Sequence, residues 1–254
     1  MSESPAVPEG VPAGEPSAAP GVLATLGSLY LEPRTAFTAI ARRASRWWIP
    51  MLGCVVLNLI LIGVWLHKMD PHQFMADQIE EQGGAKTVPN GDVEAAVNQR
   101  APFVKPFAWV AGTIFPPIAM VVFAALLMFI YRFFYEGQFS FAQALSVVTW
   151  QSLTVVLVTI PLILIVMFAK GEWSVDPASM VNANLSVFLE KGQVSKALFA
   201  LAGSFDLFTF WTQFLLASGF GVLTRKPTAG AFWGVFIPWC LWIAVKVGYF
   251  ALRG

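Results

Sequence analysis

Long apolar runs separated by polar segments dominate the pattern of this chain. Five of the runs are long enough to cross a bilayer, because about 20 helical residues span its hydrocarbon core. They cover about residues 49–66, 107–134, 141–168, 198–223 and 231–252. The pattern predicts an all-α polytopic membrane protein with five transmembrane helices. An odd number of crossings also places the two termini on opposite sides of the membrane.

Composition supports a membrane protein and argues against several other classes. Of the 254 residues, 57% are hydrophobic and 12% are charged, and a typical soluble domain carries about twice that share of charge. The net charge of +1 argues against a nucleic-acid-binding protein. The sequence contains no phosphate-binding Gly-rich loop, no G-x-S-x-G elbow and no H-E-x-x-H motif, so we expect neither an enzyme nor a cofactor.

A metal site is also not expected. His67, Asp70 and His72 are close together in the sequence. In a flexible polar loop, however, two histidines and one acid lack the fixed geometry that metal ions require.

Two different segments precede the first span. Residues 1–20 are rich in Pro, Ala, Glu and Ser and predict a disordered tail. Residues 21–47 predict an amphipathic interfacial helix, in which Pro33 is suited to the first position of a new helix. The side chains expected to meet anionic headgroups and the membrane interface are Arg34, Arg42, Arg43, Arg46, Trp47 and Trp48.

The connections between spans contain further signals. Two polar segments, 67–105 and 169–197, are long, and stretches near 71–82 and 92–100 predict short amphipathic helices. Pro116 and Pro117 predict a kink in the second span. Basic residues are densest on the short segments of one side, so the N terminus is expected in the cytoplasm and the C terminus outside.

Several polar residues lie inside the apolar runs. In lipid, such side chains usually face other helices. The set comprises Asn58, Gln143, Gln151, Thr154, Thr209 and Gln213. Hydrogen bonding between helices is the preferred interpretation, and a transport pathway is the alternative.

Asp206 and Lys246 are the two charges most deeply placed in the closing pair of spans. Two antiparallel helices joined by a short turn bring them to one depth. The preferred interpretation is an ion pair that fixes how the two helices dock. Two others stay open: Lys246 extends to the outer surface, or Asp206 titrates in a proton- or ion-coupled transporter.

Three groups of motifs, in this order, resemble the Yip domain family. The first is Leu31-Glu32-Pro33-Arg34-Thr35-Ala36-Phe37-Thr38-Ala39-Ile40 with Trp47-Trp48-Ile49-Pro50. The second is Gly137-Gln138-Phe139-Ser140-Phe141 with Gln143-Ala144. The third is Phe205-Asp206-Leu207-Phe208-Thr209-Phe210-Trp211, then Gly219, Gly221, Trp242 and Lys246. The 67–105 loop departs from the pattern because it is longer than in many relatives.

The resemblance implies a five-span membrane protein without catalytic residues. The composition and the short basic turns indicate a bacterial member, which we expect in the inner membrane. Eukaryotic members are linked to Rab-type GTPases and vesicle traffic. We therefore expect a non-catalytic protein that organises membrane lipid or recruits partners. A transporter of small solutes or lipids, or a membrane subunit of a transport assembly, is the alternative. A second copy of the chain and another membrane protein both stay open as partners.

Overall fold

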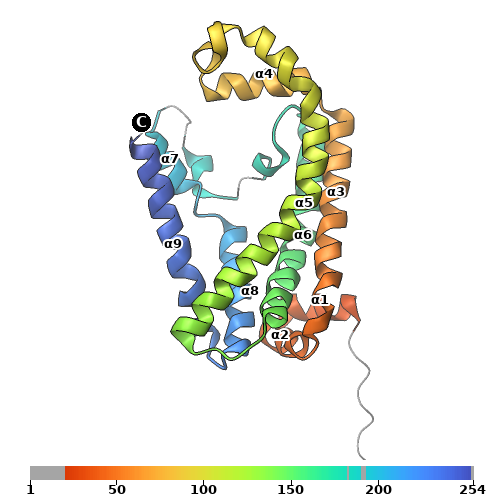
Figure 1. Cartoon of the computed structure of the whole chain (residues 1–254), viewed down its shortest axis with the longest axis vertical. Helices are drawn as coiled ribbons and strands as arrows, with labels where there is room; N and C mark the ends of the chain where they lie inside the picture. The colour runs from red at the N-terminus through yellow and green to blue at the C-terminus, as the bar shows by residue number, and fades with distance from the viewer. Residues whose placement is uncertain (1–20, 182, 190–192, 253–254) are drawn as a thin grey trace, which may run out of the picture.

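The described part of the chain, residues 21–181, 183–189 and 193–252 of a computed structural model, is built from helices (Figure 1). The α-helices are α1 Val22–Leu31, α2 Pro33–Ala41, α3 Trp48–Lys68, α4 Pro71–Gln82, α5 Val93–Tyr135, α6 Phe141–Lys170, α7 Lys196–Ala202, α8 Leu207–Leu223 and α9 Thr228–Leu252. Short 3-10 helices η1 to η5 lie at Ala44–Arg46, Gly84–Thr87, Pro89–Gly91, Pro177–Ser179 and Leu185–Phe188. The tail predicted at 1–20 lies outside the described residues.

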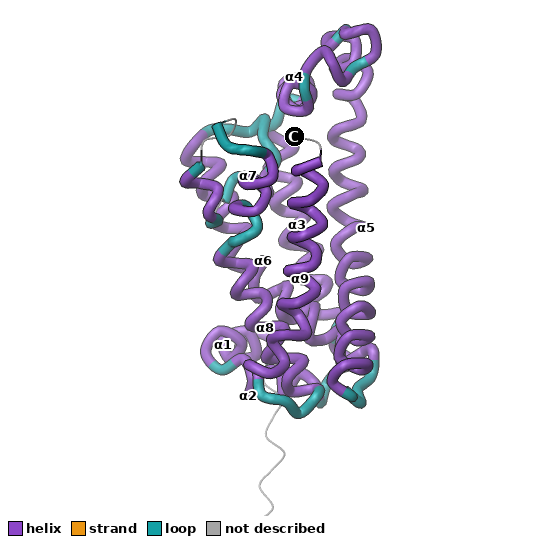
Figure 2. The backbone as a smooth tube through the Cα atoms, turned by 90° about the vertical axis from the view of Figure 1, so that its left-hand side faces the viewer, coloured by secondary structure: helices purple, strands orange, loops and turns teal. Residues whose placement is uncertain are grey.

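Four helices within those residues are long and apolar enough to cross a bilayer. They are α3 with the turn before it (Ala44–Lys68), α5, α6 and α9. They run along the long axis of the molecule, with α1 and α2 at one end and α4 at the other (Figures 1 and 2). The prediction of an all-α polytopic membrane fold is confirmed. The described C-terminal end of α9 lies toward the end opposite α1 and α2 (Figure 1).

Helix α5 is much longer than the predicted second span. Its 43 residues measure about 65 Å, roughly twice the thickness of the hydrocarbon core. The stretch near 92–100, expected as a separate short helix, is the first part of α5 and packs on α4 through a small apolar cluster around Ile79 and Val97. Four prolines lie inside α5, and the helix changes direction along its length (Figure 1).

The fourth span is not one helix, which corrects the prediction of a continuous run over 198–223. Helix α7 ends at Ala202 and α8 begins at Leu207, so residues 203–206 form a break. Glycine is a poor residue for a helix interior, and Gly203 is the C-cap of α7. Aspartate is a preferred N-cap residue, and Asp206 is the N-cap of α8. Helix α8 has 17 residues, or about 26 Å, slightly less than the hydrocarbon core.

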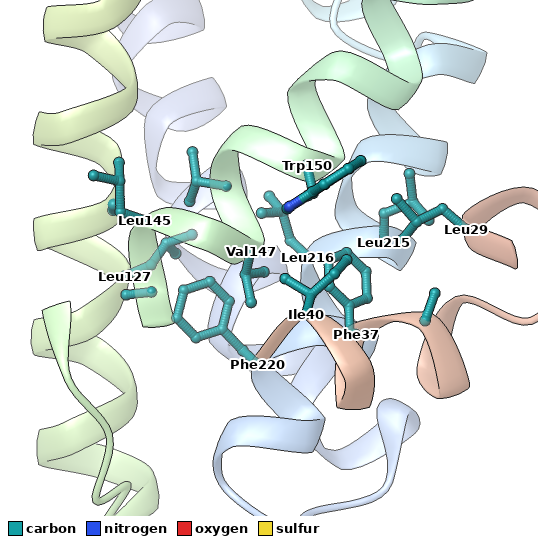
Figure 3. Close-up of a cluster of buried hydrophobic side chains, with 14 of the residues drawn as sticks. Leu29, Phe37, Ile40, Leu127, Leu145, Val147, Trp150, Leu215, Leu216 and Phe220 are labelled. Atoms are coloured by element: carbon teal, nitrogen blue, oxygen red, sulfur yellow. The ribbon is translucent and has the colours of Figure 1, made fainter. Parts of the chain in front are cut away.

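The main core lies at the end of the bundle where α1 and α2 are found (Figure 3). Leu29, Phe37 and Ile40 of the N-terminal helices are buried against residues of α6 and α8. This apolar face therefore covers protein, whereas an interfacial helix lying only on lipid would have left it exposed to the bilayer. At Gly219 a Cβ would come within 2.4 Å of Val147 Cγ1, so only glycine permits this close packing of α8 on α6.

Candidate functional sites: the helix break and the basic N-terminal segment

The α7–α8 break (residues 203–206) is held by hydrogen bonds that replace those of a continuous helix. The Asp206 carboxylate accepts from the backbone N–H groups of Phe208 and Thr209, at 2.8 and 3.1 Å. The backbone N–H of Leu207 donates to the carbonyl of Ala183 in the preceding loop at 3.2 Å. Asp206 is thus the N-cap of α8, a position in which a carboxylate is also favoured by the helix dipole.

Lys246 of α9 reaches the same break from the other side. Its ammonium donates to the hydroxyl of Ser204 at 3.2 Å. That hydroxyl in turn donates to the carbonyl of Ala200 in α7 at 2.8 Å. A cation at the C-terminal end of a helix is favoured by the carbonyl groups exposed there.

Asp206 and Lys246 therefore meet at one level, as their depth predicts, but each has its own partner. The expected direct ion pair does not form between these two described residues. The reason is the break, which exposes the C-terminal end of α7 and the N-terminal end of α8. Asp206 caps the start of α8, and Lys246 reaches the end of α7 through Ser204. Each charge is offset by the end of a helix.

The predicted polar residues of the third span lie against neighbouring elements. Gln143 accepts from the backbone N–H of Ser140 at 2.9 Å, which completes a capping box, and its amide donates to the carbonyl of Ala41 at 3.2 Å. Gln151 donates to the Thr212 hydroxyl of α8 at 3.3 Å. These two glutamines thus tie α6 to the end of α2 and to α8.

The threonines and the asparagine of this set also make hydrogen bonds, either within their own helix or to a neighbouring one. The hydroxyl of Thr154 bonds within its own helix, to the carbonyl of Trp150, and its backbone carbonyl accepts from the Tyr30 hydroxyl of α1. Asn58 of α3 donates to the carbonyl of Gly112 in α5 at 2.8 Å. Thr209 contributes the backbone N–H that Asp206 caps.

Gln213 differs from the other polar residues. Its side chain is 2% exposed, and neither its amide nitrogen nor its amide oxygen has a hydrogen-bond partner in the described structure. A buried amide without partners costs about 1–3 kcal/mol. Gln213 lies in α8, on the C-terminal side of the break.

The predicted basic residues divide into two groups. Arg34 points toward the protein: its guanidinium donates to the carbonyl of Lys226 at 3.0 Å and lies 3.5 Å from the Thr228 hydroxyl. It thereby fastens α2 to the turn between α8 and α9. Arg42 and Arg46 are exposed and Arg43 is half-buried, with no hydrogen-bond partner for these guanidinium groups in the residues described.

The two tryptophans lie where α3 begins, next to these arginines. Trp48 is 53% exposed, and Trp47 is half-buried against the main core. Amphipathic aromatic rings favour the boundary between hydrocarbon and headgroups. The basic N-terminal segment (residues 21–47) thus brings cations and interfacial aromatics to one end of the bundle.

Sequence reasoning missed Ser204, which connects the break to Lys246. It placed Ser146 of α6 on the polar side of the third span but not its partner: the hydroxyl donates to the carbonyl of Ala44 at 3.0 Å. The break has a local signal, because a glycine and an aspartate precede a new apolar run, as at many helix starts. The contacts of Tyr30 and Ser146 join residues more than 100 positions apart and have no such local signal.

The outer surface of the long helices is consistent with a bilayer around the bundle. Large apolar side chains on α5 and α9, such as Phe129, Phe133, Leu241 and Trp242, are more than 60% exposed. Together with the four long apolar helices, they define an integral membrane protein with α-helical spans.

Comparison with known families specifies this class further. A model of the Yip1 domain matches residues 26–249. The chain therefore belongs to the Yip1 domain family. No curated protein and no solved structure matches the chain.

Proposed function

We propose that this protein is a non-catalytic organiser of membrane lipid, or a recruiter of partners at the bilayer, and that it acts through its basic N-terminal segment. The observation that carries the proposal is how this segment is docked. Its apolar residues and Arg34 are used to bind it to α6, α8 and the α8–α9 turn, so Arg42, Arg43 and Arg46 are left for the membrane surface. Each basic residue near an anionic bilayer surface contributes about 1 kcal/mol to binding.

The proposed orientation places this basic end in the cytoplasm and the C terminus outside, in the inner membrane of a bacterium. The dense arginines before the first span support it, because positive charge on short segments is retained on the cytoplasmic side. With both native cysteines replaced, Ser45→Cys should react with an impermeant maleimide only after the membrane is opened, and Asn98→Cys should react in intact cells. The reverse pattern would contradict this orientation.

Reconstitution tests the proposed function directly. In vesicles of phosphatidylglycerol and phosphatidylcholine, the wild type should cluster labelled phosphatidylglycerol or change vesicle shape. A variant with Arg42, Arg43 and Arg46 all replaced by glutamine should do neither. The proposal fails if the wild type alters neither lipid distribution nor vesicle shape and copurifies with no protein partner in mild detergent.

A transporter is the second candidate, and the α7–α8 break is the observation that favours it. Interrupted helices in transporters often place helix ends at a substrate or ion site. Buried Gln213 in α8 adds a polar group without a hydrogen-bond partner among the described residues. Against this candidate, the Asp206 carboxylate is already used to cap α8.

A measurement of solute or lipid flux distinguishes the transporter from the membrane organiser. A transporter would move a solute or lipid across proteoliposomes, and Asp206→Asn would abolish that flux while the protein remains folded. The organiser predicts no such flux in either protein.

A further inference from the structure

We propose that a cavity between α1, α2, the start of α3 and α6 binds the phosphate group of an anionic membrane lipid. The inference rests on the proposed lipid-organising function and assigns it one site. The cavity has a volume of about 170 Å³. Its lining residues include Arg43 and Arg46, and we call it the Arg43–Arg46 cavity.

The two arginines give the cavity its charge. Neither guanidinium has a hydrogen-bond or ion-pair partner in the described residues, and no acidic residue is among those that line the cavity. Arg34 and Arg132, by contrast, donate to backbone carbonyls. Guanidinium groups bind phosphate oxygens in pairs with well-defined geometry, so two of them at one opening favour a phosphate group.

The floor of the cavity is apolar and therefore suits the part of a lipid next to its phosphate. Ile40, Ile49 and Trp150 line it from three different helices. Ile40 and Trp150 belong to the main core, so the floor is part of the packed protein. A site with cations at its opening and apolar side chains below matches an amphiphile better than a free anion.

The first turn of α1 adds to this environment. Gly21 and Val22 line the cavity, and the N-cap Gly21 offers no side-chain hydrogen bond to the first N–H groups of α1. Free N–H groups at the start of a helix favour a nearby anion. This contribution supports the arginines and does not define the site by itself.

The position of the cavity identifies the lipid as the source of the phosphate. It lies beside the start of α3, where Trp47 and Trp48 mark the membrane interface. In a spanning protein, lipid phosphates of the same leaflet surround this level permanently. Arg42 is exposed on the same segment but does not line the cavity, so it supplies a matched control.

Native mass spectrometry of the full chain in mild detergent, titrated with phosphatidylglycerol, tests the proposal. One tightly bound lipid is expected, with phosphatidylcholine binding more weakly. Arg43→Gln and Arg46→Gln should each weaken this binding about tenfold, whereas Arg42→Gln should weaken it less than about fivefold. Arg43→Lys should restore only part of the affinity, because lysine keeps the charge but not the paired hydrogen bonds.

The outcomes separate this site from the broader function. Equal weakening by all three glutamine variants would overturn the site while leaving a general preference for anionic lipid. Displacement of the lipid by excess inorganic phosphate would overturn the assignment to a lipid. If the wild type binds both lipids equally, the site and the lipid-organising function both fail. A melting temperature equal to that of the wild type shows that each variant is folded.

Discussion

The α1–α2 end of the bundle and the α7–α8 break use their polar residues in different ways. At the end formed by α1 and α2, polar side chains join different elements: Gln143 binds the end of α2, and Arg34 binds the α8–α9 turn. At the α7–α8 break, Asp206 caps its own helix, and Lys246 of α9 binds a hydroxyl in the break. The first arrangement fixes a tightly packed core, and the second makes an interrupted helix tolerable in an apolar environment.

The difference teaches that a charge in an apolar run does not require an opposite charge. A helix end carries about half an elementary charge, and a break in a span creates two such ends. Asp206 and Lys246 are each found at the end whose sign opposes their own. The break supplies a partner for each charge, and an ion pair is not needed to explain why both are tolerated there.

The largest effect is expected from the core at the α1–α2 end. Phe37 is fully buried, and Phe37→Ala should lower the free energy of unfolding by about 3–5 kcal/mol because it leaves a cavity. Phe188, in η5 of the loop before α7, is 83% exposed, and Phe188→Ala should change stability by less than about 0.5 kcal/mol. Thermal unfolding in detergent measures both, and similar losses would contradict the proposed difference between these two regions.

A smaller loss is expected when the link between α6 and α2 is removed. Gln143→Ala deletes one hydrogen bond of the capping box and the bond to Ala41, which should cost about 1–2 kcal/mol. Gln138 lies just before α6 and is exposed. It provides the control, because its side chain makes no hydrogen bond to the described residues. The link is unimportant if the two variants unfold at the same temperature.

The smallest effects are expected at the break. Asp206→Ala should cost about 1 kcal/mol, and Asp206→Asn less, because asparagine also caps helices well. A double-mutant cycle of Asp206→Asn with Lys246→Met should give a coupling energy under about 0.5 kcal/mol. An ion pair predicts otherwise: a loss of about 3–5 kcal/mol for the single variant and recovery when the two charges are exchanged.

The sequence predicted the elements of the fold better than their ends. Apolar runs of about 20 residues specify spans by length alone, which is why α3, α6 and α9 lie close to their predicted ranges. The extension of α5 to Val93 could not be predicted in the same way, because its first part is polar and contains Pro102 and Pro106. Its stability depends on packing against α4, which is a tertiary contact.

The candidate sites were predictable only in part. The depth of Asp206 and Lys246 follows from counting residues, but their partners depend on where the span is interrupted. The pattern of arginines around α2 suggested the membrane surface for all of them, yet Arg34 lies against a turn 192 residues away in sequence. Such pairings depend on how the helices pack, and no local pattern encodes them.

The lipid content of polymer nanodiscs tests the central claim, that the basic N-terminal segment is the end of the protein that gathers anionic lipid. Nanodiscs of the wild type should be enriched in anionic lipid over the surrounding membrane. Replacing Arg42, Arg43 and Arg46 together by glutamine should remove most of this enrichment. The matched replacement of Lys68, Arg100 and Lys105 at the opposite end should preserve it. Loss of enrichment only in the second variant, or equal loss in both, would contradict the account.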